Sequence, residues 1–188
     1  MRRTLFAVML VAAVSMPLAA QMMGGGSDNP MVGGAPMYKA KNIVENAMNS
    51  ADHTTLVAAV KAAGLVETLQ GKGPFTVFAP TNAAFDKLPA GTVETLVKPE
   101  NKATLTKILT YHVVAGNYDS KKLMSLIKKG HGQAMLKTVS GGTLTARMNG
   151  MNGISLTDEK GGTSNVTIAD VYQSNGVIHV IDTVLMPR

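Results

Sequence analysis

Five pairs of turn-forming residues divide the second half of the chain into segments of strand length. Gly-Gly and Asn-Gly pairs readily adopt the left-handed backbone that tight hairpin turns require, so strands joined by them run antiparallel. This spacing favours a succession of short antiparallel strands. The turn pairs are Gly141-Gly142, Asn149-Gly150, Asn152-Gly153, Gly161-Gly162 and Asn175-Gly176. The strands predicted between and beside them cover residues 135–139, 143–148, 154–157, 166–171 and 177–182.

The first half has the apolar spacing of amphipathic helices instead. Apolar residues recur three and four positions apart in segments 39–50, 56–63, 65–69 and 105–109, and again in 123–127. Asp52 is a possible N-cap of the second helix, and Gly64 would end it. Residues 75–79 are β-branched and aromatic and predict a buried strand, followed by a short helix capped by Thr81, with Phe78 and Phe85 both buried. Because helices precede a run of antiparallel strands, the predicted class is α+β.

The first twenty residues have the pattern of a secretory signal peptide. A basic start at Arg2 and Arg3 precedes an apolar run and the small residues Ala19 and Ala20, which favours cleavage after Ala20. An uncleaved membrane anchor is the less favoured alternative, because the run is shorter than the roughly 20 residues of a span and contains Pro17. No later segment is apolar enough to span a bilayer. We therefore expect a secreted mature chain, extracellular or periplasmic.

Charge and residue content narrow the function classes of such an exported chain. Without Arg2 and Arg3, 16 basic residues stand against 12 acidic ones, a net charge of +4, which is well short of a nucleic-acid-binding profile. The chain contains no cysteine, which excludes disulfides, iron–sulfur clusters and a cysteine nucleophile. Aromatic residues make up only 4% of the chain, and tryptophan is absent, so platforms for stacking bases or sugars are poorly supplied.

Residues 21–37 predict a flexible linker ahead of a folded domain over residues 38–188. Five glycines, two prolines and the lack of apolar periodicity favour a tether. The segment also contains Met22, Met23, Met31 and Met37, whose thioethers are potential ligands for Cu(I). Their irregular spacing, without a histidine among them, favours the plain linker over a copper site.

Three motifs in this domain resemble those of the fasciclin domain family. Residues 73–85, GPFTVFAPTNAAF, resemble the first conserved box, and residues 175–182, NGVIHVID, resemble the second. Tyr111-His112 between them is similar to the Tyr-His motif of the family. Asn82 and Ala83 depart from the acidic residues common at their positions, which removes a charge at a helix start. The resemblance covers about residues 38–187, essentially the whole mature domain.

The resemblance implies a wedge-shaped β-sandwich with helices packed around it and a secreted, non-enzymatic role in adhesion or matrix organisation. In animal members, an Asp-Ile pair before the second box and the Tyr-His region have been tied to integrin recognition. The matching residues here are Asp170, Val171, Tyr111 and His112. On this interpretation the Asp170 carboxylate coordinates a receptor-bound cation. The alternative is that Asp170 ends a strand and bonds to a turn, while Val171 fills the core.

His112 and His179 stand among aliphatic residues, which predicts buried imidazoles bonded to neighbouring backbone or carboxylate groups. A metal or haem ligand is the functional alternative, but the four histidines show no ligand spacing. We therefore predict no metal site and no cofactor, and motifs of hydrolases such as Gly-x-Ser-x-Gly or His-Glu-x-x-His are absent from the sequence. An envelope protein that binds haem, copper or a small apolar molecule stays open as an alternative to the adhesion module.

Residues 119–157 contain six basic residues and one acidic residue. Four of them, in the helix predicted around residues 123–127, should face solvent because they fall away from its apolar stripe: Lys121, Lys122, Lys128 and Lys129. They form either a solvated face or one that docks the domain on an anionic polysaccharide. No aromatic residue lies in this stretch, so nucleic acid is disfavoured. The expected partner is a cell-surface or matrix protein or an anionic polysaccharide.

Overall fold

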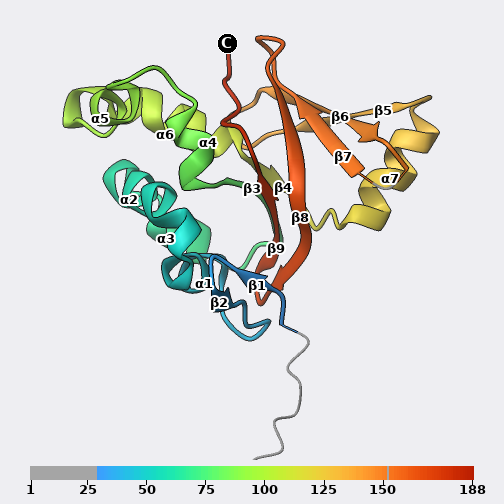
Figure 1. The fold of residues 1–188 in the computed structure, drawn as a ribbon, viewed down its shortest axis with the longest axis horizontal. Helices are drawn as coiled ribbons and strands as arrows, with labels where there is room; N and C mark the ends of the chain where they lie inside the picture. Colours follow the sequence, from blue (N-terminus) through green and yellow to red (C-terminus); the bar gives the residue numbers. More distant parts are fainter. Residues whose placement is uncertain (1–28, 152) are drawn as a thin grey trace, which may run out of the picture.

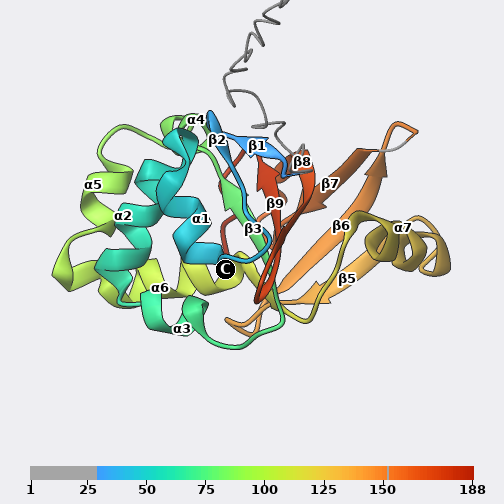
Figure 2. The same ribbon diagram turned by 90° about the horizontal axis from the view of Figure 1, so that it is seen from below.

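The computed structural model describes residues 29–151 and 153–188, and the predicted signal peptide and residues 21–28 lie outside them. Figures 1 and 2 show the arrangement. The α-helices are α1 Ile43–Asn49, α2 Thr54–Ala63, α3 Val66–Gln70, α4 Asn82–Asp86, α5 Thr92–Leu96, α6 Lys102–Tyr111 and α7 Ser120–Lys129, with 3-10 turns η1 Ala51–His53 and η2 Pro99–Asn101. The strands are β1 Met31–Val32, β2 Ala35–Pro36, β3 Phe75–Pro80, β4 Val113–Ala115, β5 Gln133–Lys137, β6 Thr143–Asn149, β7 Gly153–Thr157, β8 Thr163–Gln173 and β9 Gly176–Ile181.

Seven of these strands form one curved sheet in the order β4-β3-β9-β8-β7-β6-β5. All neighbours are antiparallel except β3 and β9, which run parallel. Residues 163–165 of β8 pair with β7 and residues 166–173 pair with β9, and the register of the pairing with β9 shifts on both sides of Ile168. A bridge between Val114 and Thr138 joins the two ends of the sheet. The sheet is therefore folded into a nearly closed wedge, which confirms the predicted α+β class.

The core lies on both faces of β3 and β9. Helices α1 to α6 cover one face of these strands (Figure 2). On this face Val77 and Ile178 form a cluster with apolar side chains of the helices. Phe78 points to the other side, into the wedge, where the side chains of β5, β6 and β7 meet it and α7 packs with Leu123 and Ile127. Strands covered on both faces have nearly continuous apolar sequences, which explains the pattern of residues 75–79.

Helix ends follow the predicted capping residues at two of three places. The Thr81 hydroxyl accepts a hydrogen bond from the Ala84 N–H at 3.2 Å at the start of α4. Gly64 ends α2 in the left-handed conformation, with φ of 71°. The prediction of Asp52 as an N-cap is wrong: Asp52 lies inside η1, and His53 occupies the capping position without a side-chain bond. Phe78 and Phe85 are 0% and 7% exposed, which confirms their predicted burial.

The N-terminal hairpin of β1 and β2 corrects the predicted linker. Val32 and Met37 are 4% and 2% exposed and join the core beneath the helices. The turn at Gly33 has φ of 58°, and the Gly33 carbonyl accepts a bond from the Ala51 N–H at 3.2 Å. A Cβ at Gly33 would stand 2.6 Å from the Asp52 nitrogen, so the close approach requires glycine. The prediction of a linker is therefore wrong for residues 31–37, because two buried apolar side chains fix this segment.

Candidate functional site

His112 ties the C-terminal segment to the centre of the fold. Its ring Nδ1–H donates to the Ile108 carbonyl at 2.8 Å, and Nε2 accepts from the Leu185 N–H at 3.0 Å. These partners require the neutral tautomer with its proton on Nδ1. Burial lowers the pKa of His112 to about 4, although the Ile108 carbonyl and the Asp158 charge act in the opposite direction. The predicted buried imidazole is confirmed at this position.

Tyr111, the other half of the Tyr-His motif, is also fully buried. Its hydroxyl donates to the Thr143 carbonyl at 2.7 Å and accepts from the Glu159 N–H at 3.1 Å, which connects α6 to both ends of the β6–β7 hairpin region. Burial raises the pKa of Tyr111 to about 12. A Cβ at Gly142 would lie 2.7 Å from the Tyr111 ring, so a glycine is needed where the two chains cross.

The half-buried Asp170 and the buried His179 form a second polar group beside the start of α7. The Asp170 carboxylate accepts the Ser120 N–H at 2.6 Å and the Ser120 hydroxyl at 2.5 Å. The Asp170 N–H donates to His179 Nδ1 at 3.4 Å, and His179 Nε2–H donates to the Tyr118 carbonyl at 2.7 Å. The His179 ring stacks on Phe78 with 5.7 Å between centroids, and burial lowers the pKa of His179. Both nitrogens of this histidine are therefore used within the fold.

The four residues matched to integrin recognition lie almost entirely inside the molecule. Val171 and Tyr111 are 0% exposed and His112 is 3% exposed, so a partner reaches only the half-buried Asp170. Val171 fills the core, as the structural alternative expects. Asp170 differs from that alternative, because it lies within β8 at a register shift and accepts hydrogen bonds from Ser120, the first residue of α7, instead of ending a strand at a turn. Its role in adhesion stays a prediction.

Replacing Asp170 by alanine is expected to lower the free energy of unfolding by about 2 kcal/mol, because both bonds to Ser120 are lost and alanine tolerates the left-handed φ of 60° poorly. Asp170→Asn, which accepts one of these bonds and tolerates that backbone, should cost about 1 kcal/mol. Urea unfolding of the three proteins measures both changes. An Asp170→Ala protein as stable as the wild type would show that this contact contributes nothing.

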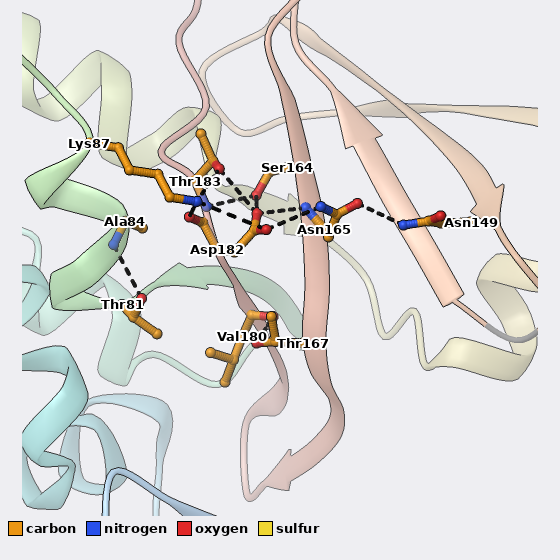
Figure 3. Close-up of polar contacts among 10 residues, drawn as sticks. All are labelled: Thr81, Ala84, Lys87, Asn149, Ser164, Asn165, Thr167, Val180, Asp182 and Thr183. Atoms are coloured by element: carbon orange, nitrogen blue, oxygen red, sulfur yellow. Dashed lines mark hydrogen bonds and ion pairs between the residues drawn. The ribbon is translucent and has the colours of Figure 1, made fainter.

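Asp182 directly follows β9 and connects this end of the strand to β8 and to Lys87, as Figure 3 shows. Its Oδ1 accepts the Asn165 N–H at 2.8 Å and its Oδ2 accepts Asn165 Nδ2–H at 3.1 Å. Lys87 donates to the Asp182 carbonyl at 2.6 Å, with its ammonium 4.0 Å from the carboxylate. Burial acts to raise the pKa of Asp182, but the Asn165 and Thr183 hydrogen bonds and the Lys87 charge outweigh it and lower the pKa.

Four exposed lysines occupy the outer side of α7, while Leu123 and Ile127 on its inner side are 0% exposed. We call Lys121, Lys122, Lys128 and Lys129 the α7 lysine face. Lys122 lies with its ammonium 4.5 Å from the centroid of the Tyr118 ring. The single ion pair among the described residues joins Lys87 and Asp182. Within this part of the chain, none of the four lysines of the α7 lysine face therefore forms an ion pair with a carboxylate. The predicted exposure of the four lysines is confirmed.

The outward face of the sheet carries a row of polar side chains that the sequence did not single out. Cross-strand partners place Gln133, Arg147, Ser155 and Asn165 side by side on β5, β6, β7 and β8. We call these four residues the polar row. From the sequence alone, Arg147 is only one of the six basic residues of segment 119–157. Alternation of polar and apolar residues predicts the outward face of each strand, but only the register shows which residues are neighbours.

The apolar core between the helices and the sheet encloses a small cavity. An apolar cavity of about 40 Å³ lies between α1, α2 and β3, and His112 is among the residues that line it. A cavity that holds benzene is about 150 Å³, so this one is far too small for haem. Among residues 29–151 and 153–188, no three His, Asp or Glu side chains gather as a metal site. In the same residues, we find no helix with the length and apolarity to cross a membrane.

Comparison with known proteins assigns the chain to a family. The model of the fasciclin domain matches residues 51–187. The chain belongs to the fasciclin domain family. It is 45% identical over 178 residues to Protein sll1483 of Synechocystis, covering 93% of this chain and 90% of that relative. It is 35% identical over 188 residues to the cell surface glycolipoprotein MPB83 of Mycobacterium bovis, covering 94% and 76%.

A solved fasciclin structure has the same architecture. It is the FAS1 domain pair of the insect cell adhesion molecule fasciclin I, with a TM-score of 0.69 and 21% identity. The match covers 78% of this chain and 51% of that one, so the chain spans about half the length of the pair. At this identity the likeness shows the fold alone. It confirms the predicted fasciclin-like wedge with helices packed around it.

Proposed function

We propose that this fasciclin domain is a secreted, non-enzymatic adhesion module that docks on an anionic polysaccharide through the α7 lysine face. Relatives support the general role, since one is named a cell surface glycolipoprotein and the matching structure comes from a cell adhesion molecule. The observation that carries the proposal is the contrast between the two sides of α7. Four exposed lysines stand on one side, and two fully buried aliphatic residues fix the other.

Contacts at its start and on its buried side fix the position of the helix that carries the lysines. The Asp119 carboxylate caps the helix by accepting the Lys122 N–H at 2.8 Å, and Asp170 binds Ser120 from β8. Both carboxylates near the start of the helix are thereby occupied by hydrogen bonds. A polymer with repeated negative charges can meet several lysines at once, and modest contributions from each pair then add up. Such binding weakens as salt screens the charges.

The four lysines of the α7 lysine face are to be replaced together by glutamine. We expect affinity for immobilised polygalacturonate to fall about tenfold or more, since each exposed ion pair contributes about 0.2–1 kcal/mol. The unfolding free energy should change by less than about 1 kcal/mol, because the side chains are exposed. Affinity chromatography with a salt gradient measures the retention.

A second variant controls for net charge. Lys61, Lys72, Lys98 and Lys102 are exposed and belong to the helical side of the molecule, so replacing them by glutamine removes the same charge elsewhere. This control should elute close to the wild type if the α7 lysine face is the site. Equal elution of both quadruple variants would show that retention follows net charge alone, and equal elution of all three proteins would show that the α7 lysine face is merely solvated.

A further inference from the structure

The polar row crosses four strands in register on the outward face of the wedge. Arg147 faces Gln133 on one side and Ser155 on the other, and Ser155 faces Asn165. Neighbouring strands stand about 4.8 Å apart, so the row presents polar groups at regular intervals. Gln133 and Arg147 are exposed, and Ser155 and Asn165 are half-buried.

Hydrogen bonds connect three of the four side chains of the row to neighbouring side chains. Arg147 Nη2–H donates to Gln133 Oε1 at 3.1 Å, and Asn149 Nδ2–H donates to Asn165 Oδ1 at 2.8 Å. Asn165 is fixed in turn by Asp182 (Figure 3). Since these bonds restrict the side chains of Gln133, Arg147 and Asn165, a ligand that binds them loses less conformational entropy than one that binds free side chains. Arg147 uses one of its five N–H donors on Gln133. The remaining N–H groups of the guanidinium can still form a pair of parallel hydrogen bonds to one carboxylate.

The surrounding surface indicates an acidic and hydrophilic ligand. A second cross-strand row lies parallel to the first and consists of Met135, Thr145, Thr157 and Thr163. Lys137 lies on the same side of β5, and no carboxylate stands among the outward residues of β5, β6 and β7. The carboxylate that contacts the row is that of Asp182, which is bonded to Asn165 and lies 4.0 Å from the Lys87 ammonium, so part of its charge is compensated. Met135 is the one large apolar side chain exposed on these rows, so the face lacks the aromatic and apolar anchors typical of protein interfaces.

We propose that the polar row binds the carboxylate-bearing sugars of an acidic polysaccharide. The guanidinium of Arg147 takes a sugar carboxylate in a two-bond fork, while Ser155 and the Gln133 and Asn165 amides bond to sugar hydroxyls. This inference rests on the proposed function and names the chemistry of its partner. The loop from α7 to β5 links the two surfaces, since Lys129 precedes Gln133 by four residues.

The test separates the fork of Arg147 from its charge. Arg147→Lys keeps the charge and removes the fork, and Arg147→Gln removes both. We expect both variants of the full mature chain to bind soluble polygalacturonate about tenfold more weakly than the wild type, measured by affinity electrophoresis. Lys61→Gln, which removes a charge on α2, should stay within about twofold of the wild type. None of these proteins should be retarded by neutral dextran.

The outcomes distinguish this inference from the proposed function. Wild-type affinity in Arg147→Lys and Arg147→Gln, together with weak binding by the α7 lysine variant, would overturn the polar row and leave the proposed function standing. Weak binding by the Arg147 variants with normal binding by the α7 lysine variant would overturn the α7 lysine face as the docking site and leave the polar row standing. If Arg147→Gln alone binds weakly, a point charge suffices and the carboxylate fork is wrong. Failure of the wild type to bind polygalacturonate, or equal binding to neutral dextran, would overturn both proposals.

Discussion

Replacing Phe78 by alanine is expected to lower the free energy of unfolding by about 3–5 kcal/mol, which is among the largest effects available in a well-packed core. Phe78 is 0% exposed and lies on β3 inside the wedge, where apolar side chains from β5, β6, β7 and α7 surround it. Its ring also stacks on His179, so the substitution removes packing from a buried histidine as well. Denaturant unfolding with the midpoint and slope fitted together measures the change.

An aromatic residue on the surface provides the matched control. Tyr38 is 41% exposed, and Tyr38→Ala should cost less than about 1 kcal/mol. A loss below about 1 kcal/mol for Phe78→Ala as well would contradict the described packing, because a buried aromatic side chain contributes more than that.

Acidification from pH 7 to pH 4 is expected to remove about 3 kcal/mol of stability through His112 alone. The pKa of His112 falls from 6.5 to about 4 in the folded protein, because burial disfavours the charged ring. Between these values the unfolded chain binds a proton that the folded chain does not, so stability decreases as pH falls from about 6.5 to about 4. Burial also lowers the pKa values of His53 and His179, which adds to the loss in the same direction.

Variants of His112 test this assignment. His112→Gln should be less stable than the wild type at pH 7, because the bonds to Ile108 and Leu185 are weakened or lost. Its stability should nevertheless fall less steeply between about pH 6.5 and pH 4, since one titrating group is missing. Urea unfolding across this range gives the two pH profiles. Parallel profiles for the variant and the wild type would show that His112 does not carry the expected acid sensitivity.

Much of the strand pattern follows from local sequence, because turn pairs mark the ends of most strands. The segment predicted at 143–148 is β6 Thr143–Asn149, and that at 177–182 is β9 Gly176–Ile181. β8 is longer than the predicted 166–171, because residues 163–165 also pair with β7 and residues 172 and 173 also pair with β9. The hairpin of β1 and β2 and helix α5 were missed because two to five residues are too few to show a period.

Contacts between distant segments explain what the sequence did not predict. No local pattern indicates that β3 and β9 run parallel, because the paired residues are far apart in the sequence. Phe75, for example, pairs with Gly176, which lies 101 residues further along the chain. Burial of His112 was predicted from its aliphatic neighbours, but its partner Leu185 lies 73 residues away. Asp170 and Ser120 are similarly separated by 50 residues. Helical periodicity predicted the exposure of the α7 lysines, whereas the polar row depends on strand register.

We propose that this fasciclin domain adheres through charge to an acidic polysaccharide. To test this, binding of the mature chain to a polygalacturonate layer is compared with binding to the same polymer after its carboxylates are methyl-esterified. We expect binding to the acidic layer at low salt, little binding to the esterified layer, and loss of binding near 1 M salt, where the screening length is about 3 Å. Equal binding to the acidic and the esterified layer, or binding that does not respond to salt, would contradict the claim.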